Sequence, residues 1–123
     1  IDIVNKKIGL GPDYREKTNK STFALESHII WLREMKLDDR MFFTVQLLDY
    51  DKKRIHFFVT MLHYDKNYEA ATYEVLLMHV NLSNKKSCVF PENVRNKIEL
   101  TMKEHSKLPK PKLCSSTVGI RRK

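Results

Sequence analysis

Residues 23–35 read FALESHIIWLREM, and this stretch decides the fold class. Its larger apolar residues recur mainly at every second position, which is the period of a β-strand. Such a strand places Glu26 and His28 together on one face. The opposite face is predicted to hold larger apolar side chains, namely Phe23, Leu25, Ile29 and Trp31.

Three further apolar runs follow, at residues 41–48, 55–62 and 70–82. They are rich in Phe, Val, Ile, Thr and Tyr, and short clusters of Asp, Asn, Lys and Ser separate them. Runs of this composition with breaks of this kind predict β-strands joined by turns. Because short connections favour hairpins, the simplest predicted topology is a four-stranded antiparallel meander.

Both faces of this predicted sheet need cover. In the third and fourth runs one face is strongly apolar, whereas the other mixes apolar residues with His56 and Glu74. A sheet that faced water on one side would carry polar residues there. The mixed face therefore predicts a second covering layer, most simply a partner subunit.

Helical periodicity marks the two ends of the chain. Apolar residues recur every three or four positions over 91–105, and the proline-rich stretch 108–111 is expected to end that helix. Residues 118–123 are expected to form either a short edge strand or a solvated end. Residues 1–8 have helical spacing before the Gly-Leu-Gly-Pro stop at 9–12. We interpret them as the end of a longer helix whose beginning is missing.

The 123 residues and 14.6 kDa suit one domain over 1–123. Basic residues exceed acidic ones by 23 − 15 = 8, so the expected partner carries negative charge. No window approaches the ~18 consecutive apolar residues of a membrane helix, so no membrane partner is expected. Cys88 and Cys114 are too few for a zinc site or a disulfide framework. We therefore expect reduced thiols, a cytoplasmic protein and no metal.

The chain has no phosphate-cradling loop, dinucleotide fingerprint, zinc-protease helix or serine elbow. Chemistry must then rest on ionisable residues inside the strands. Glu26 with His28, and Glu74, can be catalytic groups, or each can be a paired structural group at an interface. For His56 the simpler interpretation is a satisfied strand histidine, and for Trp31 a core or interface residue.

Lys52, Lys53 and Arg54 form a basic turn, which is either solvated or a binding site for the phosphates of a nucleotide or nucleic acid. Sheet proteins that bind nucleic acid expose aromatic rings beside their basic residues. Here Phe57 and Phe58 are expected to be buried. We therefore expect no nucleic-acid partner.

The chain resembles the acyl-CoA thioesterases of the hotdog fold. The resemblance is carried by an E-x-H-I-x-x-L strand at 26–32 and an Arg-x-His strand at 54–56, supported by residues 46–49 and 70–74. The nearest branch also occurs fused behind carnitine dehydrogenases and is associated with betainyl-CoA. It implies an α+β fold, a curved antiparallel sheet around a central helix, with a C-terminal helix. Members begin with a strand and a D-x-N-G-H-like turn, so this sequence is expected to lack that strand and the start of the central helix.

The resemblance also implies residue roles. Catalytic roles are implied for Glu26, His28 and Glu74. Substrate contacts are implied for Trp31, Thr72, Tyr73 and His56, and contacts with coenzyme A phosphates for Lys52, Lys53 and Arg54. No metal or cofactor is implied, since coenzyme A enters as part of the substrate. For a quaternary ammonium acyl group, the nearest candidates for an aromatic or acidic wall are Trp31, Tyr73 and Glu26.

The implied function is hydrolysis of a short acyl-CoA thioester, with betainyl-CoA among the candidates and carnitine metabolism as the setting. The implied assembly is a homodimer with its active sites at the subunit interface, and the sequence leaves open whether dimers pair into tetramers. The alternative is a non-catalytic hotdog module that binds acyl-CoA or serves dimerisation. The missing N-terminal part favours that alternative.

Overall fold

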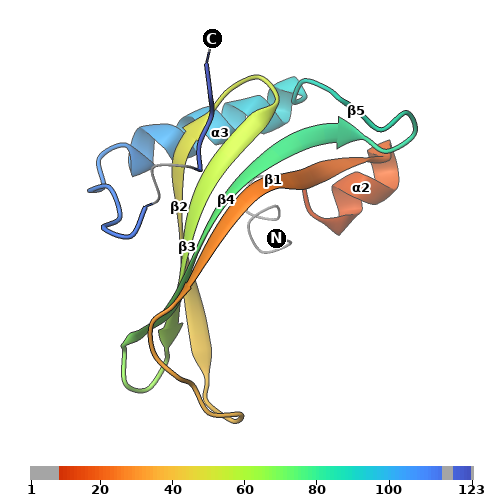
Figure 1. Ribbon diagram of the computed structural model, residues 1–123. Coiled ribbons are helices and arrows are strands. Elements are labelled where there is room, and N and C mark those ends of the chain that lie inside the picture. The colour runs from red at the N-terminus through yellow and green to blue at the C-terminus, as the bar shows by residue number, and fades with distance from the viewer. Residues whose placement is uncertain (1–8, 115–117, 123) are drawn as a thin grey trace.

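The computed structural model describes residues 9–114 and 118–122. One strongly curved antiparallel sheet runs through the molecule, with helices against part of it (Figure 1). The elements in chain order are α2 (Pro12–Thr18), β1 (Lys20–Trp31), β2 (Met41–Tyr50), β3 (Arg54–His63), β4 (Glu69–Asn81), β5 (Lys86–Ser87) and α3 (Glu92–His105). The four predicted strands and the predicted C-terminal helix are confirmed.

The order of the strands is β1-β4-β3-β2, with β5 paired to β4. The meander prediction was therefore wrong in one pairing, because β1 lies beside β4 and not beside β2. The β2–β3 and β3–β4 connections are short hairpin turns. The connection between β1 and β2, residues 32–40, is too long for a tight hairpin turn. In the β3–β4 turn Asn67 takes the left-handed conformation, with a φ of 54°.

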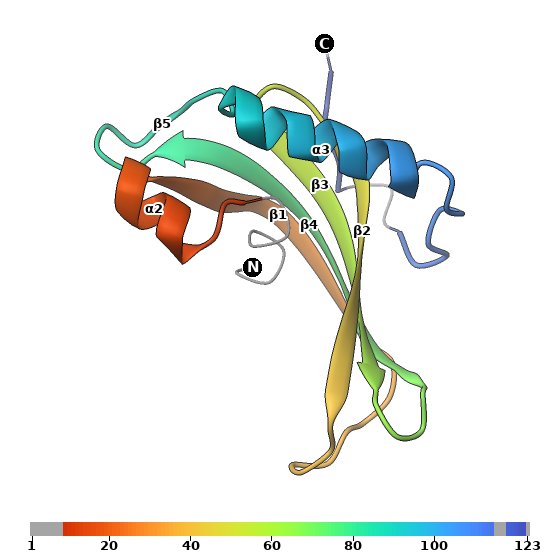
Figure 2. The same cartoon turned by 180° about the vertical axis from the view of Figure 1, so that it is seen from behind.

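Helix α3 covers the upper parts of β2 and β3 on one face of the sheet (Figure 2). Its two buried residues, Val94 and Ile98, lie four apart and so point the same way. They enter one hydrophobic core with strand residues of the same sheet face, among them Leu47, Ile55, Phe57, Val75 and Leu77. Helix residues four positions apart and strand residues two positions apart therefore pack together in this core.

Two β-bulges alter the faces that simple alternation predicts. The register shifts between Ala24 and Glu26, so Leu25 is an extra residue in β1. Phe23 consequently lies on the same face as Glu26, and its predicted place beside Trp31 was wrong. In β2 the shift falls between Leu47 and Asp49.

A short helix that was not predicted follows the glycines at 9 and 11. Pro12 occupies the first turn of this helix, α2. Asn19 ends α2 in the left-handed conformation. The predicted helix over residues 1–8, and with it the central helix of the hotdog fold, lies outside the described residues.

Residues 118–122, which we call the C-terminal strap, lie on the face of the sheet opposite α3 (Figures 1 and 2). The strap is not a strand, so the expectation of an edge strand is wrong. Its Arg121 and Arg122 are exposed, as expected for a solvated end, whereas Val118 is buried. The second covering layer that the mixed face predicted is therefore supplied in part by the chain itself.

The α3 core gives a direct test of this packing. Replacing fully buried Ile98 with Ala should lower the free energy of unfolding by about 2–5 kcal/mol, because it leaves a cavity against the sheet. Leu100→Ala on the same helix, at a side chain 63% exposed, is the matched control and should change it by about 0.5 kcal/mol or less. Urea unfolding of both variants measures the difference; equal effects would contradict the assigned face of α3.

Candidate active site

The residues predicted for the site are divided between the two faces of the sheet. His28 is in register with Glu74, and Glu74 is in register with Phe58. Paired residues in neighbouring strands share a face, so five predicted residues lie together on the strap side: Glu26, His28, His56, Thr72 and Glu74. Trp31 and Tyr73 lie on the helix side, in register with Ala71 and Ile29.

His56 and Glu74 form a buried pair. The Nε2 atom of His56 lies 2.7 Å from Oε2 of Glu74, and the two residues are only 8% and 1% exposed. A carboxylate at that depth needs a partner, and the imidazole N–H supplies one. Gly119 of the strap lies over the imidazole, where an added Cβ would come within 3.8 Å of the ring. That distance is an ordinary van der Waals contact, so the feature that favours glycine here is its φ of 153°.

Two arginines hold the strap in place. Arg122 donates two hydrogen bonds to the carboxylate of Asp49, at 2.8 and 2.9 Å, and a third to the carbonyl of Tyr50. Arg121 lies 3.0 Å from Oε1 of Glu26. The hydrogen bonds from Arg122, against the opposing effect of burial, hold the pKa of Asp49 below its ordinary value.

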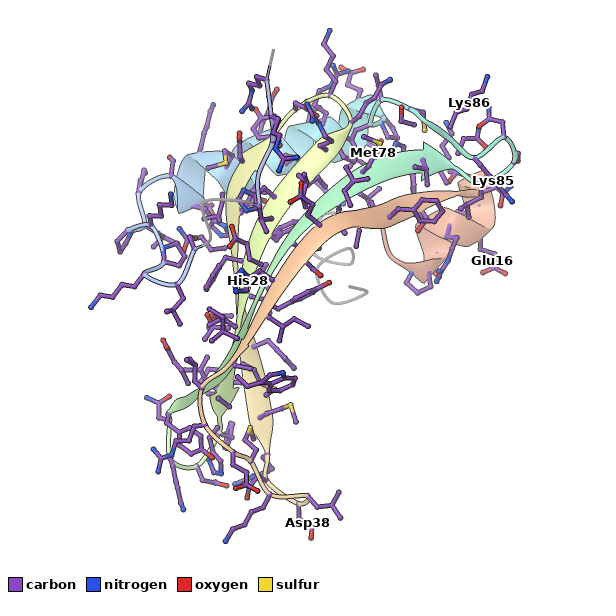
Figure 3. The ribbon with its side chains drawn as sticks, viewed as in Figure 1. Glu16, His28, Asp38, Met78, Lys85 and Lys86 are labelled. Atoms are coloured by element: carbon purple, nitrogen blue, oxygen red, sulfur yellow. The ribbon has the colours of Figure 1, made fainter. Side chains whose placement is uncertain are left out.

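The remaining strap-side candidates differ in access. His28 is exposed, and Figure 3 shows it near the middle of the sheet, away from Lys85 and Lys86 at the turn after β4. Its register partner Glu74 bonds to His56 instead. Thr72 is buried. The sequence thus correctly placed these side chains on one face, but only His28 and part of Glu26 are open to solvent.

Sequence reasoning missed a groove on the strap side. The segment that follows α3 turns back over the sheet. There the side chain of Gln46 donates a hydrogen bond of 3.3 Å to the carbonyl of Pro109. The groove beneath has a volume of about 470 Å³, and Thr44, Thr60 and Thr72 are among the residues that line it. Pro109 and Pro111 were recognised only as a helix stop, although they also explain an extended segment able to cover a sheet.

On the helix side, Trp31 is the most exposed of the predicted residues, at 76%. It lines a hollow of about 490 Å³ at the end of β1, together with Leu32, Arg33, Glu34, Met35 and Met61. Tyr73 is half-buried and packs against the hydrophobic core. Trp31 is therefore neither a core residue nor part of the strap-side cluster.

The basic turn is partly committed to internal contacts. The guanidinium of Arg54 pairs with Asp51 at 2.7 Å. Lys53 donates to the hydroxyl of Ser87 at 3.3 Å, which brings the turn beside Lys86 of β5. Lys52 is exposed. Among the described residues, Lys52 and Lys53 form no ion pair, whereas Arg54 does.

A second buried histidine belongs to a separate cluster. His79 is fully buried; its Nδ1 donates to the carbonyl of Cys88, and its Nε2 accepts from the hydroxyl of Tyr14, each at 2.9 Å. Burial lowers the pKa of His79 below its ordinary value, in keeping with a neutral ring. These contacts fasten α2 to β4.

The strand order and the curvature of the sheet fit the hotdog fold, and the solved relatives support that class. The chain belongs to the thioesterase-like superfamily, whose family profile matches residues 2–98.

The chain is 30% identical over 119 residues to a betainyl-CoA thioesterase of Pseudomonas aeruginosa, covering 97% of this chain and 75% of that protein. It is 35% identical over 121 residues to an L-carnitine dehydrogenase/betainyl-CoA thioesterase of Rhizobium meliloti. That match covers 98% of this chain and 24% of the fusion protein, so the chain spans about a quarter of that relative.

Among solved structures, a Staphylococcus aureus protein in complex with CoA superposes with a TM-score of 0.83 at 30% identity, over 98% of this chain and 75% of that one. A putative thioesterase of Pseudomonas putida gives a TM-score of 0.77 at 27% identity, over 98% and 77%. The fold and the family predicted from the strand motifs are thereby confirmed.

Within residues 9–114 and 118–122, no helix has the length and apolar character needed to cross a membrane. The same residues contain no group of three or more His, Cys, Asp or Glu side chains placed to hold a metal ion. Cys88 and Cys114 are both free thiols.

The Asp49–Arg122 pair can be tested by titration. In Arg122→Ala the pKa of Asp49 should rise toward its ordinary value of 3.8, because the hydrogen bonds that favour the carboxylate are lost. A lowered pKa stabilises the fold above that value, and the contribution disappears as the pH falls through the folded-state pKa. NMR of the carboxyl carbon measures the change, with Arg95→Ala on α3 as control. An unchanged Asp49 pKa would refute the strap contact.

Proposed function

We propose that this chain hydrolyses a short acyl-CoA thioester and that betainyl-CoA is its substrate. The observation that carries the proposal is the combination of the family with two relatives of 30% and 35% identity that are named for that reaction. The CoA complex of the S. aureus protein supports coenzyme A as the carrier. Hydrolysis uses water, so coenzyme A takes part only as a portion of the substrate. The two free thiols favour the cytoplasm, and the relatives' names favour carnitine metabolism.

The two parts of the substrate are assigned to opposite ends of β3. We assign the coenzyme A phosphates to the basic turn, where Lys52 and Lys53 lie near Lys86. Arg54 supports the turn through Asp51. The acyl group is assigned to the hollow beside Trp31 and Met61. The seven residue steps from Arg54 to Met61 correspond to about 23 Å of strand, so the bound thioester must be extended.

The catalytic roles of Glu26, His28 and Glu74 stay a prediction. Solvent access favours His28 and Glu26 as groups that touch the reacting atoms. Glu74, buried against His56, is placed to position neighbouring groups rather than to contact substrate, and Thr72 to line the strap-side groove. Trp31 and Tyr73 lie on the other face of the sheet. A thioester whose acyl group fills the hollow must therefore pass around the outer edge of β1, near the end of that strand at Trp31, to reach Glu26 and His28.

Thiol release from betainyl-CoA and from acetyl-CoA, followed with a thiol reagent, tests the activity. We expect hydrolysis above the uncatalysed rate, fastest with betainyl-CoA. His28→Asn and Glu26→Gln should lower kcat by about 100-fold or more if these residues transfer protons. Lys86→Ala and Lys52→Ala should mainly raise KM, since they act on binding alone.

The outcomes separate the alternatives. Binding of coenzyme A without thiol release would favour the non-catalytic module over the enzyme. Full activity in His28→Asn and Glu26→Gln, combined with loss in Trp31 variants, would move the catalytic site to the helix side of the sheet.

We further propose a homodimer formed along β1. Among the described residues β4 is the one strand paired with β1, so the other edge of this 12-residue strand lies at the side of the sheet, where a strand of a second chain can add. Its exposed apolar side chains away from the Trp31 hollow are Phe23, Leu25 and Ile29. A second copy of β1 can cover both features at once.

The dimer is tested by light scattering after gel filtration, where the mass should be twice the 14.6 kDa of one chain. Leu25→Lys should shift the protein toward the monomer, because it places charge in the proposed interface. Leu100→Lys makes the same change at an exposed position of α3 and should leave the dimer intact. A monomeric unmodified protein would overturn the proposal, and a mass of four chains would show that dimers pair.

A further inference from the structure

Trp31 is unusual in its exposure. A tryptophan at the end of a strand normally buries most of its large ring, yet this one is 76% exposed and borders the 490 Å³ hollow. Two methionines, Met35 and Met61, supply polarisable thioether walls to the same hollow. The hollow therefore combines an open aromatic face with apolar sides.

The backbone around the hollow is held in place. The amides of Leu32 and Arg33 both donate to the carbonyl of Ala70, at 2.9 and 3.1 Å. The carbonyl of Glu34 accepts a hydrogen bond of 2.8 Å from the hydroxyl of Tyr68. These bonds tie residues 32–34 to β4 and to the turn before it, so the hollow is formed before any ligand arrives.

The two charged residues at the hollow do not pair with each other. Arg33 contributes to the lining, but its guanidinium lies over the ring of Tyr68, 4.1 Å from the centroid. Glu34 is exposed, and its carboxylate has no ion-pair partner in the part of the chain that the structure describes. The hollow thus offers an acidic group and an aromatic face, while its arginine is engaged elsewhere.

We infer that this hollow binds the quaternary ammonium head group of the substrate, with Trp31 and Glu34 as the residues that recognise its charge. The inference rests on the proposed function and adds the specificity site to it. A quaternary ammonium has no N–H to donate, so an aromatic face, soft apolar walls and a nearby carboxylate suit it better than hydrogen-bond acceptors do. Glu26, the acidic wall predicted from sequence, faces the other side and pairs with Arg121.

The kinetic test compares betainyl-CoA with 3,3-dimethylbutyryl-CoA, in which carbon replaces the nitrogen and the shape is kept. Trp31→Leu and Glu34→Gln should each lower kcat/KM for betainyl-CoA by about two- to fivefold, as expected for an exposed cation–π contact or ion pair. Neither should change kcat/KM for the neutral thioester by that factor. Glu99→Gln, at an exposed position of α3, is the control and should change kcat/KM for neither thioester. Equal losses for both thioesters would overturn the inference.

A second measurement does not depend on hydrolysis. Trp31 is the single tryptophan of the chain, so its fluorescence reports on this hollow alone. Choline should change the emission saturably, its neutral isostere 3,3-dimethylbutanol should do so less, and Glu34→Gln should weaken the choline response. Equal responses to the two probes, or none, would overturn the head-group site. Failure to hydrolyse either thioester, with the choline response intact, would overturn the proposed function and leave the site standing.

Discussion

The structure depends on covering a sheet whose central strands are unsuited to water on either side. In β3 and β4 the alternate residues Phe57, Val75 and Leu77 point to α3, while Phe58, Glu74 and Leu76 point the other way and are also buried. One helix can cover only one of these faces. The strap and the segment around Pro109 cover part of the second face. The polar groups buried there need hydrogen bonds, and His56 and Glu74 form one with each other.

Much of this could be predicted because the signals are local. Alternation at 23–35 and at 70–82, and the period of 91–105, identify elements whose residues face the core. The pairing of β1 with β4 is not local, since it joins residues such as Lys20 and Asn81 that are far apart in sequence. The extra residue at Leu25 also escapes a pattern of period two, so Phe23 was assigned to the wrong face.

In the candidate site too, local patterns could be predicted, whereas contacts between residues far apart in sequence could not. Ionisable residues inside strands indicated the strap-side face, because burial of such groups requires a partner or a use. The sequence could not distinguish these two outcomes, and for Glu74 the structure shows a partner. Glu34 lay inside the predicted 23–35 stretch but lies beyond the observed end of β1 at Trp31, and in the sequence it resembled any solvated glutamate. The sequence also could not show that Arg33 stacks on Tyr68 and does not form an ion pair with Glu34.

The bulge in β2 has a bearing on how large the sheet can become. β2 is the other outer strand among the described residues, and an open outer strand invites further chains to add to it. Here the amide of Leu47 donates to Nδ1 of His105 at 2.8 Å, so α3 has already taken a group that an incoming chain would need. The bulged backbone also bends away from a straight template. The helix that fills the core thereby obstructs fibre-like growth along the upper half of that strand.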